Sequence, residues 1–214
     1  MLSLEKKSPD AWSHYYGSDF SWRWLRLNLT GHLPLFRWIL WPRPRRALEV
    51  GTGTATMAAL ISFSGVKVTS VDIERPILDQ AQNTLKRLHS PARLLQADAF
   101  NLPFPTGSFD VAFSQGFFEH FDDDEIRALL REQARVARRV VFSVPNETYG
   151  VQDFGNERLM PKEQWETIIR SSGLQLVKSY DYAPLRRRKA RRLPVHYLAV
   201  VNGGGFDRSS IEPA

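Results

Sequence analysis

Two glycines and two acidic residues carry the strongest chemical signal in this chain. Gly51 and Gly53 follow the apolar run Ala-Leu-Glu-Val, and Asp72 ends a second apolar run about 20 residues later. Glycine permits a sharp turn between a strand and a helix and lets a ligand approach the backbone closely. A glycine turn with an acid at that spacing is typical of sites that hold a free ribose. Asp98 ends a third run, where a carboxylate could accept a hydrogen bond from an adenine amino group.

The charge beside the turn indicates which kind of nucleoside would bind. Dinucleotide sites use a third glycine in G-x-G-x-x-G, but Thr56 stands at that position. Glu49, two residues before Gly51, would repel a diphosphate, which prefers a helix N-terminus without a neighbouring acid. The same carboxylate suits a ligand with an ammonium and a sulfonium. A nicotinamide oxidoreductase is therefore the most remote of the alternatives.

The segment Glu49-Val-Gly-Thr-Gly-Thr-Ala55 resembles motif I of the class I S-adenosylmethionine-dependent methyltransferases, whose usual form is E/D-x-G-x-G-x-G. Residues 109–120 and 140–146 are similar to the fourth and fifth strands of that family. The run Ala137-Arg-Arg139 stands where the family usually has a Pro-Gly-Gly-like turn. The resemblance covers about residues 45–200. Its motifs are specific for the cofactor and say little about the substrate.

The resemblance implies S-adenosylmethionine as the cofactor. Asp72 would accept hydrogen bonds from both ribose hydroxyls, Glu49 would face the methionine ammonium, and Ile73 would pack on the adenine. Asp98 and Ala99 would read the adenine edge by side chain and by backbone amide. The residues expected to contact the cofactor are Glu49, Gly51, Thr52, Gly53, Asp72, Ile73, Asp98, Ala99, Ser114 and Gln115.

The acceptor side carries a weaker signal. Methyl transfer from a sulfonium is an in-line displacement with a neutral leaving group, so placing the nucleophile in a dry pocket is most of the work. Glu119 and His120 follow the fourth strand and are the candidates for a general base; the plainer interpretation is that they cap a helix. Phe117 and Asn146 are expected on the substrate side. No metal site is expected, because residues 122–124 are acids at a helix start and the histidines lack zinc spacing.

The order of apolar runs and helical segments predicts one α/β domain. The fold class is a Rossmann-like, doubly wound sheet of seven strands with the last strand antiparallel, preceded by a helical N-terminal extension. Helices are expected at 54–62, 76–88, 122–138 and 161–171. The expected strands are 47–51, 67–72, 93–97, 109–114, 139–144, 174–182 and 196–202. The domain limits are 1–46 for the extension, 47–205 for the methyltransferase domain and 206–214 for a tail.

The N-terminal extension is crowded with tryptophan, tyrosine and arginine. Three interpretations stay open: a structural cap packed on the sheet, a lid over the site, or a segment that contacts a membrane interface. As a lid, it would bring Tyr15, Tyr16 or Phe20 against cofactor or substrate. The start of the chain lacks the apolar core of a signal peptide, and no apolar run reaches membrane-spanning length. We therefore expect a cytoplasmic protein.

Basic residues are clustered, and the formal net charge is +6. One cluster is the run Arg186–Arg192; a loop with so many like charges attracts phosphate, whether on RNA, an anionic lipid or a metabolite. A second cluster was expected on a helix, at Arg127, Arg131, Arg135, Arg138 and Arg139. The chain has no cysteine, so disulfides are excluded.

The sequence thus predicts an S-adenosylmethionine-dependent methyltransferase that acts on a small acceptor, apolar and aromatic or anionic. The first alternative is an RNA or ribosome-associated methyltransferase guided by the basic loop at 186–192. The second is a non-catalytic interaction module that retains the fold. The identity of the acceptor, the atom methylated and the oligomeric state stay open.

Overall fold

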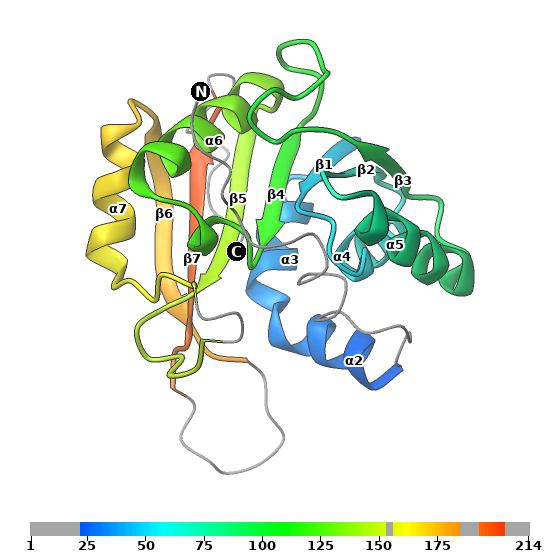
Figure 1. Ribbon diagram of the computed structural model, residues 1–214, viewed down its shortest axis with the longest axis horizontal. Helices are drawn as coiled ribbons and strands as arrows, with labels where there is room; N and C mark the ends of the chain where they lie inside the picture. Colours follow the sequence, from blue (N-terminus) through cyan, green and yellow to red (C-terminus); the bar gives the residue numbers. More distant parts are fainter. Residues whose placement is uncertain (1–21, 153–155, 185–192, 204–214) are drawn as a thin grey trace.

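The computed structural model describes residues 22–152, 156–184 and 193–203, and their path is drawn in Figure 1. Seven strands form one mixed sheet. They are β1 (Arg46–Val50), β2 (Lys67–Asp72), β3 (Arg93–Gln96), β4 (Val111–Gln115), β5 (Arg139–Pro145), β6 (Gln175–Tyr182) and β7 (His196–Asn202). Their order across the sheet is β3-β2-β1-β4-β5-β7-β6. The first five strands in the chain pair in parallel, and β7 pairs antiparallel with both β5 and β6. The predicted seven strands with an antiparallel last strand are confirmed.

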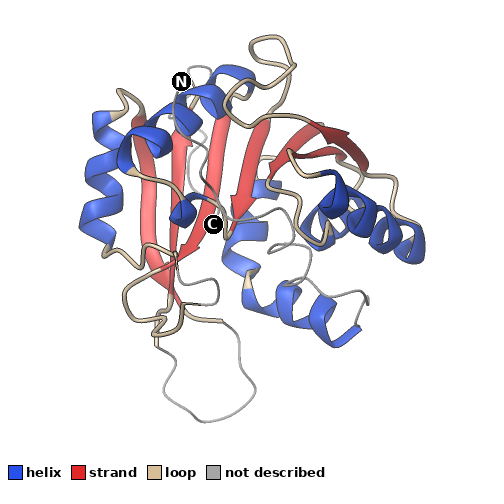
Figure 2. Cartoon of the chain, viewed as in Figure 1, coloured by secondary structure: helices blue, strands red, loops and turns tan. Residues whose placement is uncertain are grey.

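Helices cover both faces of the sheet, as Figures 1 and 2 show. They are α2 (Trp22–Gly31), α3 (Leu33–Leu40), α4 (Thr56–Ser62), α5 (Arg75–Leu88), α6 (Asp123–Val136) and α7 (Lys162–Ser171), with a 3-10 turn η1 (Phe118–His120). The core on one face packs α3 and α4 against β1, β4, β5 and β7. The core on the other face packs α6 and α7 against β5 and β7. Two layers of apolar side chains thus bury the strands, which explains their nearly continuous hydrophobic runs.

The helix ends follow local sequence rules. Asp122 precedes α6, and its side chain accepts from the Glu125 amide at 2.9 Å while the Glu125 side chain accepts from the Asp122 amide at 3.0 Å. This reciprocal pair is a capping box. Gly173 follows α7 with a φ of 80°, the left-handed conformation that ends helices. The three acids at 122–124 are thus placed as the start of a helix.

The prediction of a helix that runs to residue 138 and includes Arg139 in its basic cluster is wrong. The helix α6 ends at Val136, and Arg139 is the first residue of β5, with only 2% of its surface exposed. Its Nη2 atom donates to the carbonyl of Ile39 at 3.2 Å, and burial lowers its pKa to about 10. Arg139 therefore connects the end of α3 to the sheet instead of joining a solvated basic face.

Two other boundaries differ from the prediction by two residues, and the rest agree within one residue. The helix after the glycine turn begins at Thr56 and not at residue 54, because Ala55 has a left-handed φ of 56° and its amide donates to the Thr52 carbonyl. The fourth strand begins at Val111, and Phe109 makes only an isolated bridge with Ala137. Both changes lengthen the irregular backbone next to the strands.

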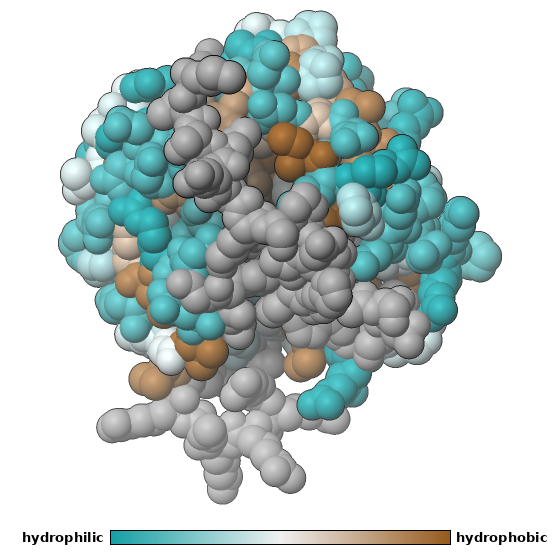
Figure 3. Space-filling model, in the orientation of Figure 1, coloured by the Kyte–Doolittle hydropathy of each residue, from teal (hydrophilic) through white to brown (hydrophobic). Residues whose placement is uncertain are grey.

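Most of the face seen in Figure 3 is hydrophilic where the structure describes it. Exposed large apolar side chains include Trp22, Leu27 and Leu29 on α2 and Leu33 at the start of α3. Within the described part of the chain, none of the helices has the length and hydropathy needed to cross a bilayer.

Candidate functional site

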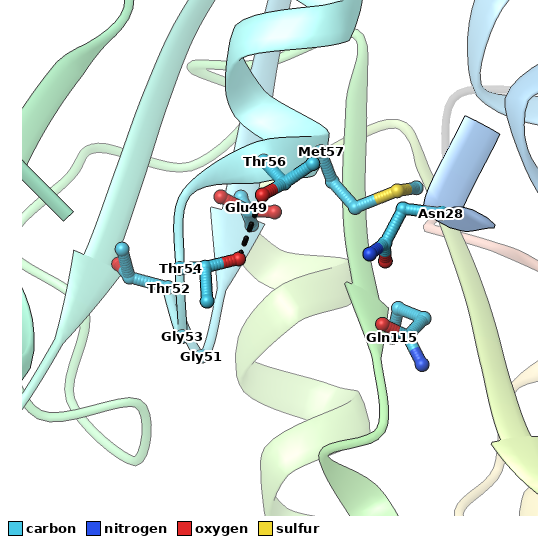
Figure 4. Close-up of a pocket in the computed structure, with 9 residues that line it drawn as sticks. All are labelled: Asn28, Glu49, Gly51, Thr52, Gly53, Thr54, Thr56, Met57 and Gln115. Carbon is cyan, nitrogen blue, oxygen red and sulfur yellow. Dashed lines mark hydrogen bonds between the residues drawn. The ribbon is translucent and has the colours of Figure 1, made fainter. Parts of the chain in front are cut away.

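A pocket lies at the carboxyl edge of β1 and β4, where the glycine turn follows β1 (Figure 4). It encloses about 370 Å³, part of it open to solvent. Its lining residues come from β1, the turn, the first residues of α4, β4 and α2. They are Asn28, Glu49, Gly51, Thr52, Gly53, Thr54, Thr56, Met57 and Gln115. The carboxyl edge is where open α/β sheets bind ligands.

The turn needs glycine for conformation and for space. Gly51 and Gly53 have φ values of 80° and 48°. A Cβ atom on Gly51 would lie 2.6 Å from the Cδ2 atom of Phe117, which is closer than side chains pack. Ala55, at the position of the third glycine of motif I, has a left-handed φ of 56° without being glycine. The ring of Phe117 thus leaves room only for glycine at position 51.

Glu49 is a buried acid in the pocket wall, with 4% of its surface exposed. Its Oε2 atom accepts from the Ser70 hydroxyl at 2.5 Å, and the Ala58 amide in α4 also donates to it. Burial raises the pKa of Glu49 to about 8, against these hydrogen bonds, and the charge of Asp72 adds to the rise. At neutral pH the carboxyl is mainly protonated, and a cation in the pocket would favour its charged form.

Asp72 ends β2 beside the same turn. Its Oδ2 atom accepts from the Thr52 amide at 3.0 Å, and its Oδ1 atom accepts from the Glu74 amide at 3.1 Å. Burial raises its pKa, although four backbone amides, those of Glu74, Thr52, Ile73 and Gly53, oppose the rise. These bonds fix the carboxylate against the glycine turn, as the sequence spacing predicts.

The other residues expected at the cofactor lie around this edge of the sheet. The Ile73 side chain is 55% exposed next to Asp72 and is free to cover a flat ring. Asp98 is exposed, and its Oδ1 atom accepts from the Phe100 amide at 2.9 Å. Gln115 lines the pocket, but Ser114 precedes it on β4 and so directs its buried side chain to the other face of the sheet. A contribution of Ser114 to this pocket would have to come from its backbone.

Four pocket residues were not anticipated from the sequence. Thr54, Thr56 and Met57 directly follow the glycine turn, so the turn itself was a signal for them. Asn28 lies on α2 and is buried. Its only sequence signal is a polar residue within an apolar and basic helix, which does not indicate a ligand.

Glu119 and His120 lie on η1, after β4, and do not line this pocket. Glu119 is buried, and its Oε2 atom has no hydrogen-bond partner among the described residues. Burial raises its pKa to about 8, and the charge of Glu157 contributes to the rise. The Nε2 atom of His120 lies 3.9 Å from Oε1 of Glu119, and its Nδ1 atom lies 3.0 Å from Oδ1 of Asn156.

The substrate-side residues are placed in part. Phe117 packs against Phe118 and Phe121 and lies over Gly51. Asn146 is buried, and its amide holds a turn: Nδ2 donates to the Pro194 carbonyl at 2.8 Å and Oδ1 accepts from the Thr148 amide at 3.0 Å. Tyr15, Tyr16, Phe20 and Arg186–Arg192 lie outside the described residues. Within those residues, no cluster of three or more metal-ligating side chains occurs.

Known methyltransferases are similar to part of this chain. A family model described as a methyltransferase domain matches residues 47–139, which span the glycine turn, Asp72 and Asp98. Residues 47–139 are thus similar to a methyltransferase domain, in agreement with the resemblance to the class I S-adenosylmethionine-dependent methyltransferases. The chain is 31% identical over 134 residues to a demethylmenaquinone methyltransferase of Thermus thermophilus, covering 61% of this chain and 57% of that protein. It is also 31% identical over 126 residues to a demethylmenaquinone methyltransferase of Thermotoga maritima, covering 58% and 48%. The chain spans about half the length of these curated relatives.

Solved structures agree with the fold of the methyltransferase domain. A protein from Pyrococcus horikoshii superposes with a TM-score of 0.68 at 17% identity, over 85% of this chain and 92% of that one. The magnesium protoporphyrin IX methyltransferase of Synechocystis, solved with bound SAH, superposes with a TM-score of 0.63 at 13% identity, over 90% and 93%. At these identities the likeness concerns the fold alone.

Proposed function

We propose that this chain binds S-adenosylmethionine in the pocket beside the glycine turn and transfers its methyl group to a small acceptor. The observation that carries the proposal is Glu49, a buried acid in the pocket wall that no cation among the described residues neutralises. A ligand with an ammonium and a sulfonium supplies the charge that such a site lacks. Glu49, once ionised, would repel a diphosphate.

The surrounding residues fit the remaining parts of this cofactor. Asp72 is held by backbone amides and keeps further lone pairs for two ribose hydroxyls. We assign Ile73, Asp98 and Ala99 to the adenine, Thr52 and Gly53 to close backbone contacts, and Ser114 and Gln115 to the methionine end. Asn28 joins this set because it faces the pocket from α2.

The chemistry asks little of the protein beyond placement. When bound, S-adenosylmethionine supplies a methyl group on a sulfonium, which leaves as a neutral thioether. The protein then has to hold the acceptor in line, exclude water and, for an acceptor that loses a proton, take up that proton. We retain Glu119 and His120 as proposed bases. Glu119 with a pKa of about 8 would be mainly protonated at neutral pH, so His120 is the better of the two.

The acceptor is proposed to be small and apolar or aromatic. Phe117 brings an aromatic ring over the glycine turn, and the two relatives described above are named demethylmenaquinone methyltransferases. Two proposals rest on the sequence alone. One is a lid formed by Tyr15, Tyr16 or Phe20, and the other is an anionic partner bound at Arg186–Arg192.

Isothermal titration calorimetry tests the cofactor assignment. We expect S-adenosylmethionine and S-adenosylhomocysteine to bind with micromolar dissociation constants, and NADH not to bind. Methyl incorporation into candidate acceptors is then followed by mass spectrometry. A protein that ignores both sulfur nucleosides but binds NADH would contradict the proposal.

A further inference from the structure

Four polar side chains meet at the carboxyl edge of the sheet, outside the lining of the pocket. The Tyr182 hydroxyl lies 2.7 Å from Nδ1 of His32 and 2.7 Å from Oγ of Ser143. The ring of His196 has its centroid 5.0 Å from that of His32 and 5.4 Å from that of Tyr182. We call these four residues the His196 cluster. They come from four separate segments: the junction of α2 and α3, β5, the end of β6 and the start of β7.

The His196 cluster adjoins the pocket along two paths. The His32 amide donates to the carbonyl of Asn28 at 3.1 Å, and Asn28 lines the pocket. Ser143 pairs in register with Gln115, which also lines the pocket, so both side chains lie on the same face of the sheet. Neighbouring strands are about 4.8 Å apart, so β7 lies roughly 10 Å from β4. An aromatic acceptor can span that distance across the sheet.

The groups of the cluster are neutral, and one of them lacks a partner. Burial lowers the pKa of His196 to about 4, and burial together with the neighbouring His196 lowers the pKa of His32 to about 3. Burial also raises the pKa of Tyr182, so its hydroxyl keeps its proton. The Nδ1 atom of His196 is buried and has no hydrogen-bond partner among the described residues. Such an atom is costly to leave unpaired, so a ligand that pairs with it gains affinity.

The surroundings of His196 favour a flat ligand. The ring of Tyr149 has its centroid 5.7 Å from that of His196, which adds a third ring to those of His32 and Tyr182. Aromatic side chains pack favourably against flat rings at such separations. Burial is the main cause of the lowered pKa of both histidines, and His196 adds to the effect at His32.

We propose that the His196 cluster is the recognition site for the methyl acceptor, and that the acceptor is a neutral hydroxylated aromatic compound. This inference rests on the proposed methyl transfer. One hydroxyl of the acceptor donates to Nδ1 of His196, and the rings of Tyr149 and Tyr182 cover its aromatic part. The opposite end of the acceptor then lies toward Asn28 and Gln115, at the pocket. His196 acts in recognition and does not take the proton from the reacting atom.

Binding of the cofactor product, S-adenosylhomocysteine, is measured first. Failure of the proposed function can then be told apart from failure of this inference. Calorimetry gives the affinity of S-adenosylhomocysteine for the wild type and for His196→Phe, Tyr182→Phe and Tyr180→Phe. Three probes are then titrated into the S-adenosylhomocysteine complex: 4-ethylphenol, 4-ethylanisole and 4-ethylbenzoate. Each probe has the same ethyl-substituted benzene ring. 4-Ethylphenol carries a hydroxyl that can donate a hydrogen bond, 4-ethylanisole has no such donor, and 4-ethylbenzoate carries a negative charge. Tyr180→Phe is the matched control, because its hydroxyl lies on the same strand but pairs with Trp38 at 3.1 Å.

We expect 4-ethylphenol to bind the wild type about tenfold more tightly than 4-ethylanisole, as for one neutral hydrogen bond. The preference should vanish in His196→Phe, weaken in Tyr182→Phe and persist in Tyr180→Phe. In protein labelled with ¹⁵N-histidine, the Nδ1 resonance of His196 should move with 4-ethylphenol alone.

Three results would overturn the inference while the proposed function stands: no probe binds the S-adenosylhomocysteine complex, 4-ethylbenzoate binds best, or the preference survives in His196→Phe. Failure of the wild type to bind S-adenosylhomocysteine would instead overturn the proposed function, and this inference with it.

Discussion

Cofactor binding should release close to one proton at pH 7, because of Glu49. Burial raises the pKa of this carboxyl to about 8, so roughly 90% of the molecules carry it protonated at pH 7. The ammonium of the amino-acid end pairs with Glu49 only as a carboxylate, so binding must ionise it. Ionising the group one pH unit below its pKa costs about 1.4 kcal/mol, which weakens apparent affinity about tenfold at pH 7.

Isothermal titration calorimetry with S-adenosylhomocysteine measures this proton directly. In buffers of different ionisation enthalpy, the slope of observed enthalpy should give about 0.9 protons released at pH 7. The dissociation constant should fall as pH rises toward 8, because Glu49 is then ionised before binding. In Glu49→Gln the proton release should vanish. Glu119→Gln is the matched control, since Glu119 is also buried with a pKa of about 8 and should leave the release unchanged.

The raised pKa of Glu49 also makes the unfolding free energy depend on pH. A buried acid whose pKa rises from 4.5 to about 8 holds a proton that the unfolded chain loses, so the unfolding free energy should fall between about pH 5 and 8. The ligand should reduce this fall. Proton uptake on binding, no exchange at pH 7, or a release that persists in Glu49→Gln would refute the reasoning.

Three further predictions concern single residues. Asp72→Asn should weaken S-adenosylhomocysteine binding about tenfold to a hundredfold in calorimetry, because hydrogen bonds to a charged acceptor become neutral; unchanged affinity would remove Asp72 from the ribose site. Gly51→Ala should lower the unfolding free energy in urea by about 1–3 kcal/mol, because its Cβ would lie 2.6 Å from Phe117 at a φ of 80°; a stable variant would contradict the turn geometry. Asp122→Ala should lower the unfolding free energy by about 1 kcal/mol in the same assay, because the capping box is lost. Asp124→Ala is the control and should lower it less, because the Asp124 side chain only pairs with Arg127 at the surface. Equal losses in the two variants would argue against the cap.

The sequence predicted the parts of the site that depend on local order. Gly51, Gly53 and Asp72 lie within one strand-turn-helix unit and the strand after it, so their spacing alone places them at one edge of the sheet. The seven strands were predictable for the same reason, because each is a short apolar run bounded by turn residues. The error at Arg139 arose because neighbouring arginines look like a solvated helix end, whereas burial beneath α3 is decided by packing between distant segments.

The remainder of the site depends on contacts that no sequence window contains. Asn28 reaches the pocket only because α2 packs against the sheet, and it has no local signature of a ligand contact. His32 and Tyr182 are separated by 150 residues in the chain and meet at 2.7 Å. In the sequence, His32 and His196 lack the spacing of zinc ligands, and no local pattern marks either of them as a site residue.

β7 lies between β5 and β6 and pairs antiparallel with both, so the β6–β7 hairpin forms one edge of the sheet. The matched family segment, residues 47–139, ends where β5 begins, so the β6–β7 hairpin and the helices α2 and α3 lie outside it. Exchanging the β6–β7 hairpin and α2 together, while keeping the glycine turn, is therefore a rational route to chimeras with altered substrate preference. Such a graft would leave the glycine turn and the contact of Arg139 with the Ile39 carbonyl on α3 in place.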